Sequence, residues 1–282
     1  MRDDFAVFIL THNRPSKIRT LNSLRSSGYT GRIYLVCDDG DPSLEQYRKK
    51  FGDKVLVFSK DEIAKEFDQA DNFADRRTIF YARNATWSLA KGVGVRYFIE
   101  LDDDYSCFSY RRRRPSQTGW IIRDIDRVFD LMVEFLEGTG AATVAMSQGG
   151  DHVGGDAGNT ERTNRLTRKA MNTFVCDATR PFPFMGRINE DVNTYVSLGN
   201  RGVLFFTYWM LQVTTLPTQR SSGGMTELYL DSGTYLKSFY TVMYAPSCVK
   251  VEWSVQMRRF HHSINWRHAV PKIVAERHRV AA

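Results

Sequence analysis

The sequence predicts an α/β fold in which a mostly parallel sheet is flanked by helices. Short apolar segments alternate with segments of helical spacing over the first 146 residues, the pattern of parallel strands joined by covering helices. Two of the apolar segments end in aspartates, and ligands collect at the carboxyl ends of strands in such sheets. With 282 residues, of which 42% are apolar, the chain is long enough to bury a large core.

The first half of the chain is expected to alternate strands with helices. The apolar segments predict strands over residues 5–10, 33–36, 55–58, 95–101 and 142–146. A first helix is predicted between Pro15 and the stop at Gly28. A second is predicted from Asp75, a suitable N-cap, to about Lys91. Apolar residues at helical spacing predict a third over residues 121–137.

The second half begins with a polar segment that is rich in glycine. Residues 148–159 contain five glycines, which predicts a loop that is either mobile or ordered only by a ligand. Strands are then expected over residues 171–176, 203–213 and 248–251, and helices over 187–199 and 232–244. No repeat or linker interrupts the chain, so we expect a single domain over residues 1–282 with a C-terminal elaboration.

Composition limits the cellular setting and the partners. The formal net charge is +7, which favours a polyanionic partner but by itself bears only on solubility. No segment approaches the roughly 20 apolar residues that a membrane span needs. The N-terminal segment lacks the pattern of a signal peptide. The four cysteines are far apart in sequence and fit free thiols. We therefore expect a soluble cytoplasmic protein.

Three consecutive aspartates follow the predicted strand over 95–101. Asp102, Asp103 and Asp104 repel one another, and carboxylates at the end of a strand suit a hard divalent cation such as Mg²⁺ or Mn²⁺. The alternative is a solvated acidic turn. Asp38 and Asp39 follow another strand and have the same alternative. Neither a GxxxxGK[ST] loop nor a GxGxxG after the first strand is present, so a P-loop or dinucleotide site is not expected.

Five segments occur in an order that resembles the nucleotide-sugar glycosyltransferases of the GT-A fold. They are FAVFILTHNRP, CDDG, YARN, IELDDD and INEDV. Later segments, SSGGMTELY, GTYLKSFYTVMYAPSCVKV and RRFHHSINWRHAVPKI, are similar to the phage and base-J-associated enzymes that glycosylate hydroxymethylated pyrimidines in DNA. The resemblance covers nearly the whole chain. It implies a nucleotide-sugar-binding half over residues 1–146 and an acceptor-binding half with a tail over 147–282.

The resemblance also implies roles for individual residues, with a UDP-sugar as donor and Mn²⁺ or Mg²⁺ as cofactor. The residues implied in nucleotide-sugar binding are Thr11, Arg14, Asp38 or Asp39, Arg83, Asn84, Asp102 and Asp103. The implied metal ligands are Asp104 and Asp102, with His261 or His262. Glu190 and Asp191 match an acidic pair near the acceptor, with Asp191 as the base and inversion at the anomeric carbon. Three aspartates depart from a strict DxD, and Asp104 is preferred over Asp103 as the ligand.

A DNA acceptor carrying hydroxymethylcytosine or hydroxymethyluracil is the partner that the resemblance implies. Two basic clusters could contact phosphates, and aromatic side chains beside the second could stack on a base. The residues are Arg111, Arg112, Arg113 and Arg114, and then Arg258, Arg259, Trp266 and Arg267.

Each of these patterns also has a structural explanation without a functional role. Arginine runs are often only solvated, Asp191 suits a helix N-terminus, and His261 and His262 could be half-buried packing residues. Two other functions stay open. One is a GT-A enzyme with a polysaccharide or protein acceptor, and the other is an inert DNA- or nucleotide-binding module on the same fold.

Overall fold

Nine strands form the central sheet, in the order β3-β2-β1-β4-β8-β7-β9-β5-β6. A computed structural model describes residues 1–71, 75–111, 120–148, 170, 172–215, 225–255, 258–269 and 276. The strands of the sheet are β1 (Phe5–Leu10), β2 (Arg32–Asp38), β3 (Val55–Phe58), β4 (Tyr97–Asp102), β5 (Cys107–Tyr110), β6 (Trp120–Ile121), β7 (Thr143–Gln148), β8 (Phe174–Asp177) and β9 (Phe205–Thr214). β10 (Val249–Ser254) and β11 (Arg259–Ile264) form a separate antiparallel pair.

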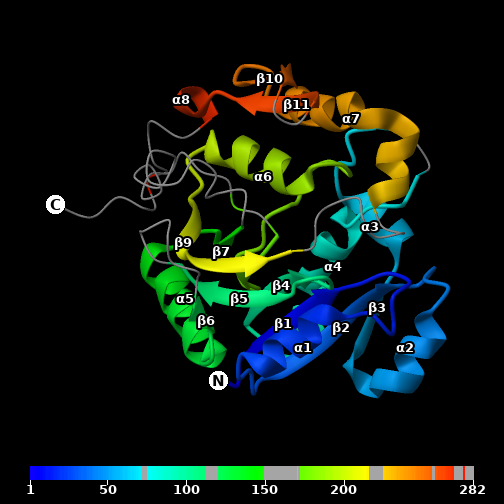
Figure 1. The fold of residues 1–282 in the computed structure, drawn as a ribbon, viewed down its shortest axis with the longest axis vertical. Coiled ribbons are helices and arrows are strands. Elements are labelled where there is room, and N and C mark those ends of the chain that lie inside the picture. Colours follow the sequence, from blue (N-terminus) through cyan, green and yellow to red (C-terminus); the bar gives the residue numbers. More distant parts are fainter. Residues whose placement is uncertain are drawn as a thin grey trace.

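Helices cover both faces of the sheet. They are α1 (Arg19–Ser26), α2 (Leu44–Phe51), α3 (Lys60–Glu66), α4 (Phe80–Gly92), α5 (Ile125–Thr139), α6 (Glu190–Gly199), α7 (Met225–Tyr244) and α8 (Trp266–Ala269), and a 3-10 turn spans Gly52–Lys54. Figure 1 shows α1, α2 and α5 on one side and α4 and α6 on the other. Beyond α6, on the side away from the sheet, α7, β10, β11 and α8 form a further layer.

The predicted α/β class, with helices on both faces and a C-terminal elaboration, is confirmed. The strands are parallel through β3, β2, β1 and β4. β8 then runs antiparallel between β4 and β7, and β7 pairs in parallel with β9. The carboxyl ends of β1, β2 and β4 therefore meet at one edge of the sheet, where the predicted site residues begin.

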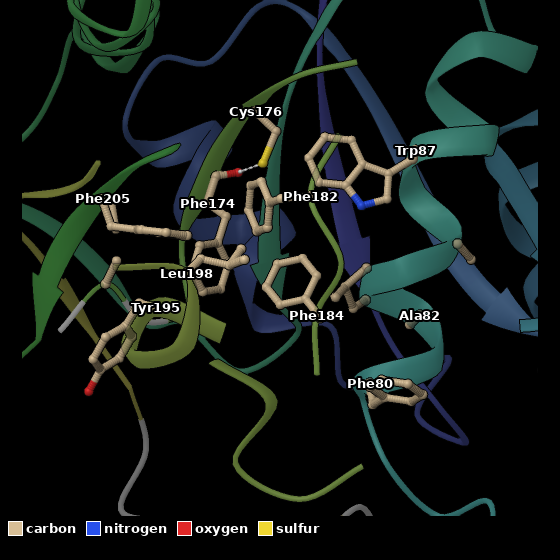
Figure 2. Close-up of a cluster of buried hydrophobic side chains, with 14 of the residues drawn as sticks. Phe80, Ala82, Trp87, Phe174, Cys176, Phe182, Phe184, Tyr195, Leu198 and Phe205 are labelled. Atoms are coloured by element: carbon tan, nitrogen blue, oxygen red, sulfur yellow. Dashed lines mark hydrogen bonds between the residues drawn. The ribbon is translucent and has the colours of Figure 1, made fainter. Parts of the chain in front are cut away.

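Alternate residues of β1 serve two hydrophobic cores. Phe5, Val7 and Ile9 face the core under α1 and α5, whereas Ala6, Phe8 and Leu10 face the core under α4 and α6. The second core is rich in aromatic rings. Figure 2 shows Phe182 and Phe184 between Trp87 of α4 and Phe174 of β8. The ring centroids of Trp87 and Phe182 are 5.1 Å apart, as are those of Phe174 and Phe184. These edge-to-face contacts fix the segment that leads to α6.

Several helices begin later than the sequence predicts. α1 begins at Arg19 instead of Pro15. α4 begins at Phe80, because the carboxylate of Asp75 accepts hydrogen bonds from the backbone and guanidinium of Arg77 in a local turn. α5 begins at Ile125 because Ile121 pairs with β5. α2, α3, β5, β6, β11 and α8 were not predicted from the sequence. Each has eight residues or fewer, which is too short for a clear periodic signal.

Two further predictions concern the cysteines and the membrane. Cys37, Cys107, Cys176 and Cys248 are all free thiols, as expected. Within the described residues, no helix combines the length and the apolar composition needed to cross a membrane. The glycine-rich segment over 148–159 lies outside the described residues from Gly149 onward.

Gly28 closes the turn after α1 and is expected to tolerate no side chain. Its φ is +82°, and a Cβ atom there would lie 2.5 Å from the carbonyl oxygen of Arg123. Gly28→Ala should therefore lower the free energy of unfolding by about 1–3 kcal/mol in denaturant titrations. Gly52→Ala is a matched control, because Gly52 also has a positive φ but has open space at the Cβ position. Equal losses in the two variants would contradict the steric explanation.

Candidate active site

The ends of β1 and β4 are joined by polar contacts. Thr11 Oγ1 donates a hydrogen bond to Asp103 Oδ2 (2.8 Å), and Arg14 Nη1 donates to Asp103 Oδ1 (3.1 Å). The hydroxyl group of Tyr47 lies 2.9 Å from Thr11 Oγ1 and accepts from the backbone N–H of Arg14 (2.8 Å). Burial raises the pKa of Asp103, and Arg14 and Thr11 oppose this effect. Three predicted donor-site residues thus form one network, in which both carboxylate oxygens of Asp103 have protein partners.

The end of β2 holds a second group, which includes His12, a residue that the sequence analysis missed. His12 Nδ1 lies 2.7 Å from Asp38 Oδ2 and 3.6 Å from Asp41 Oδ2. Lys60 Nζ lies 3.1 Å from Asp38 Oδ1. Burial would raise the pKa of Asp38, but His12 and Lys60 bring it below its ordinary value. Asp39 is exposed, so of the two predicted aspartates only Asp38 belongs to this buried group.

His12, Asp38 and Asp41 are the one set of three potential metal ligands that lie close together among the described residues. Their oxygens already have cationic or N–H partners. Lys60 neutralises Asp38, and Asp41 accepts from the backbone N–H groups of Asn13 (2.8 Å) and Ser43 (2.7 Å). A divalent cation would have to displace these donors, so the set does not fit a metal site. It fits hydrogen bonding to a polar ligand at the edge of the sheet.

Asp102 and Asp104 fit a divalent cation better. Asp102 Oδ1 accepts a hydrogen bond from Arg83 Nη2 (3.2 Å). Asp104 is half-buried, and among the described residues its carboxylate forms no hydrogen bond or ion pair with another side chain. Burial raises the pKa of Asp102 to about 7, and the charges of Asp104 and Asp103 add to this effect against the opposing Arg83. Burial and the charge of Asp103 likewise raise the pKa of Asp104. A cation bound here would relieve this repulsion.

Arg83 is the centre of a buried charge cluster that joins three elements. Its side chain is 1% exposed, and its guanidinium binds three carboxylates. Nε donates to Glu190 at 2.9 Å, Nη1 to Glu100 at 3.1 Å, and Nη2 to Asp102 at 3.2 Å. The guanidinium also lies 4.9 Å from the ring centre of Phe174. The contacts connect α4 with the end of β4 and the start of α6.

The three carboxylates of this cluster have raised pKa values. Burial raises the pKa of Glu100, Asp102 and Glu190 to about 7 in each case, although Arg83 opposes the shift. The carboxylates in turn raise the pKa of Arg83 against the effect of its burial. Thr86 Oγ1 donates to the second oxygen of Glu100 (2.6 Å). Glu100 is a residue that the sequence analysis missed, because it occupies an apolar strand.

Asn84, also predicted to face the donor, is buried, and its side-chain amide forms hydrogen bonds with the backbone. Its Oδ1 accepts from the N–H of Phe184 (2.9 Å), and its Nδ2 donates to the carbonyl oxygen of the same residue (3.1 Å). This pairing holds the segment before α6 against α4. The described partners of Arg83 and Asn84 are therefore protein groups inside the fold.

Glu190 and Asp191 form the first turn of α6, where the helix dipole favours negative charge. The preceding residue, Asn189, has a φ of +56°, and its amide donates to the carbonyl oxygen of Lys237 (2.6 Å) and to Thr241 Oγ1 (3.2 Å) on α7. Glu190 is held by Arg83, whereas Asp191 Oδ1 accepts from the N–H of Val192 (2.7 Å). The two acids thus differ, because Asp191 has no bond to the arginine.

The predicted C-terminal residues lie in the outer layer. His261 and His262 are in β11, opposite Glu252 and Val251 of β10. Trp266 stacks on Tyr195 of α6, with ring centres 5.8 Å apart. Arg258 and Arg267 are exposed, and Arg259 is half-buried.

The other basic cluster is described only at its first residue. The guanidinium of Arg111 donates to Gln212 Oε1 (2.8 Å) on β9. Arg112, Arg113 and Arg114 lie outside the described residues.

Two hollows lie beside α7, away from the aspartates. One, of about 470 Å³, is lined by Asp68, Gln69, Ala70, Asp71, Met243 and Tyr244. The other, of about 420 Å³, shares Asp68 and Tyr244 with it and extends to Phe184. Neither includes a residue that the sequence predicts for donor binding. The strand-edge groups, and not these hollows, carry the chemistry of the site.

Comparison with known proteins identifies related sequences and folds. A model of the TET-associated glycosyltransferase family matches residues 5–224. No curated protein matches the chain. Glucosyl-3-phosphoglycerate synthase from Mycobacterium tuberculosis, crystallised with UDP, is 13% identical, with 92% of this chain and 87% of that chain covered and a TM-score of 0.45. The same enzyme with Mn²⁺, UDP-glucose and phosphoglyceric acid is also 13% identical, with 92% and 85% covered and a TM-score of 0.44. Scores this low carry no argument about function.

Proposed function

The chain belongs to the TET-associated glycosyltransferase family, and on this premise we propose that it transfers a sugar from a UDP-sugar to the hydroxyl group of a 5-hydroxymethylpyrimidine in DNA. Membership makes the protein a glycosyltransferase. The donor, the acceptor and the residue roles are the proposal. The observation that supports the site most directly is the cluster around Arg83, which brings the end of β4 and the acidic start of α6 together on one guanidinium.

The donor is proposed to bind at the ends of β1, β2 and β4. Thr11, Arg14 and Asp103 form the wall of this site through their mutual hydrogen bonds. Asp38, with His12 and Lys60 beside it, is suited to polar groups of a nucleoside. Asp102 and Asp104 are the proposed ligands of Mn²⁺ or Mg²⁺, which when bound would stabilise the charge that develops on the leaving diphosphate. A ligand role for His261 or His262 stays a prediction.

The acceptor is proposed to react beside Asp191. The oxygen of the hydroxymethyl group attacks the anomeric carbon, the bond from that carbon to the diphosphate breaks, and its electron pair leaves with UDP. The hydroxyl proton passes to the carboxylate of Asp191, which is not paired with an arginine. Glu190, bound to Arg83, is proposed to position this turn of α6. A single displacement inverts the anomeric carbon.

DNA is favoured as the acceptor over a polysaccharide or a protein. The family description places these enzymes with TET proteins. The net charge of +7 favours a polyanion, and Arg258 and Arg267 present exposed cations on the outer layer. The alternative acceptors would need neither feature.

The proposal is tested by incubating the protein and Mn²⁺ with UDP-sugars and DNA that carries cytosine, 5-hydroxymethylcytosine or 5-hydroxymethyluracil. Nucleoside mass spectrometry is expected to detect one added sugar only on the hydroxymethylated bases. Excess chelator should abolish transfer and added Mn²⁺ should restore it, because Asp102 and Asp104 cannot hold the diphosphate without a cation. Equal transfer to a free sugar or a peptide would refute the DNA acceptor, and full activity in chelator would refute the metal site.

A further inference from the structure

Four exposed aromatic side chains form one connected surface on the outer layer. Tyr235 and Phe239 stack on α7 with ring centres 6.0 Å apart, Tyr235 contacts Phe260 at 5.8 Å, and Phe260 contacts Trp253 at 5.4 Å. The exposed fractions are 54% for Tyr235, 39% for Phe239, 56% for Trp253 and 43% for Phe260. We call these four residues the aromatic platform.

The spacing of these residues in α7 and in the β10–β11 pair brings the four rings together. Tyr235 and Phe239 are four residues apart and so lie on one face of α7. Trp253 and Phe260 are direct cross-strand partners in β10 and β11. The opposite face of α7 holds Ser238, Tyr240 and Thr241, all of them buried. The helix is therefore anchored by its other face, and the platform rings are not needed to fill a core. A contiguous exposed surface of this kind indicates a binding partner.

The outer layer that carries the platform has more basic than acidic side chains, which favours an anionic partner. In the described residues 235–255 and 258–269, the basic side chains are Lys237, Lys250, Arg258, Arg259 and Arg267, and the acidic one is Glu252, which forms an ion pair with Lys250 (2.5 Å). Exposed rings on a cationic layer are a combination that binds unpaired nucleotides, because bases stack on the rings while cations meet the phosphates. In a duplex the base faces cover one another and cannot stack on such rings.

The platform is attached to the candidate active site through α7. Asn189, directly before the acidic pair, donates hydrogen bonds to Lys237 and Thr241 on the inner side of this helix. The platform rings on α7 stand on its outer side, so they lie on the order of one helix diameter, ~10 Å, from Asn189. The platform also lies wholly beyond residue 224, where the match to the family model ends.

We propose that the aromatic platform binds unpaired nucleotides of the acceptor DNA by stacking on their bases. The inference rests on the proposed function for the identity of the acceptor. It adds that the DNA is held in single-stranded form next to the reacting base, and it assigns this task to the layer formed by α7, β10 and β11.

The test measures fluorescence anisotropy of a labelled, unmodified single-stranded oligonucleotide and of the matching duplex with the full chain. The single strand is expected to bind more tightly than the duplex. Trp253→Ala and Phe260→Ala should each raise the Kd for the single strand by about 5- to 150-fold, the loss expected for one base–ring stack. Trp253→Phe keeps a ring and should retain most of the affinity.

Tyr208→Ala is the matched control, because Tyr208 is 42% exposed, like Phe260, but lies on β9 outside the platform. Its Kd should not change. Equal affinities in all variants, or tighter binding to the duplex, would overturn the inference. So would sedimentation that shows a dimer which the platform variants dissociate. Platform-dependent binding without transfer to hydroxymethylated DNA would instead refute the acceptor chemistry and leave the docking surface standing.

Discussion

The Asp191→Asn variant is expected to lose about 10²–10⁴-fold in kcat, the usual cost of removing a general base. Asparagine keeps the size of the side chain and can still accept the hydrogen bond from the N–H of Val192. It cannot take the proton of the acceptor hydroxyl. Single-turnover transfer to hydroxymethylated DNA measures the chemical step, and calorimetry measures the affinity for UDP and Mn²⁺. This affinity should stay nearly unchanged, because the donor is proposed to bind at the strand ends, away from Asp191.

The stereochemistry of the product provides an independent check on this role. With Asp191 as the base of a single displacement, NMR of the native product should show an inverted anomeric carbon. Asn193 on the same helix is not a suitable control position for Asp191. Its side-chain amide donates hydrogen bonds to the carbonyl oxygens of Met185 and Ile188, so replacing it would disturb the backbone. A variant with native kcat, or a product of retained configuration, would leave Asp191 with only its position at the helix N-terminus.

Replacing Arg83 by methionine is expected to lower the free energy of unfolding by about 3–5 kcal/mol, because it strands buried carboxylates that have lost their counter-charge. Glu100 and Glu190 would remain buried, and Asp102 partly exposed. Arg83 opposes the rise in their pKa values, so its removal raises these pKa values further. The folded variant then binds more protons than the folded native protein, and its stability falls more as the pH rises. The deficit should therefore be larger at pH 8 than at pH 5 in denaturant titrations.

A surface ion pair provides the control for Arg83. Arg127 lies 3.4 Å from Glu134, and both side chains are exposed. Arg127→Met should cost about 0–1 kcal/mol, as exposed pairs do. If Arg83→Met cost no more than Arg127→Met, or if its deficit did not depend on pH, the cluster would not be the electrostatic centre of the site.

The sequence predicted eight of the eleven strands, because buried strands are short, apolar and bounded by polar residues. It also predicted that Asp38 and Asp102 follow strands that meet at one edge. It did not predict the partners of Arg83. Glu190 is 107 residues away in the chain, and Glu100 looks like a strand residue. Contacts of this kind depend on how the elements pack, which periodicity does not report.

The same limit applies to residue roles in the acidic cluster. Asp102, Asp103 and Asp104 are equivalent in the sequence, but Asp103 is bound by Thr11 and Arg14. Asp38 and Asp39 are adjacent, yet one is buried beside Lys60 and the other is exposed. Consecutive residues at the end of a strand point in different directions, and only the surrounding elements decide which side chain is available to a ligand.

The position of β8 affects how the chain reaches its folded state during synthesis. β8 lies between β4 and β7, yet it is made after both of them. Until residues 174–177 leave the ribosome, β4 has an open edge and β7 lacks its antiparallel partner. The nascent first half therefore cannot close its own sheet, and its exposed strand edge is the point at which premature association with other chains would begin.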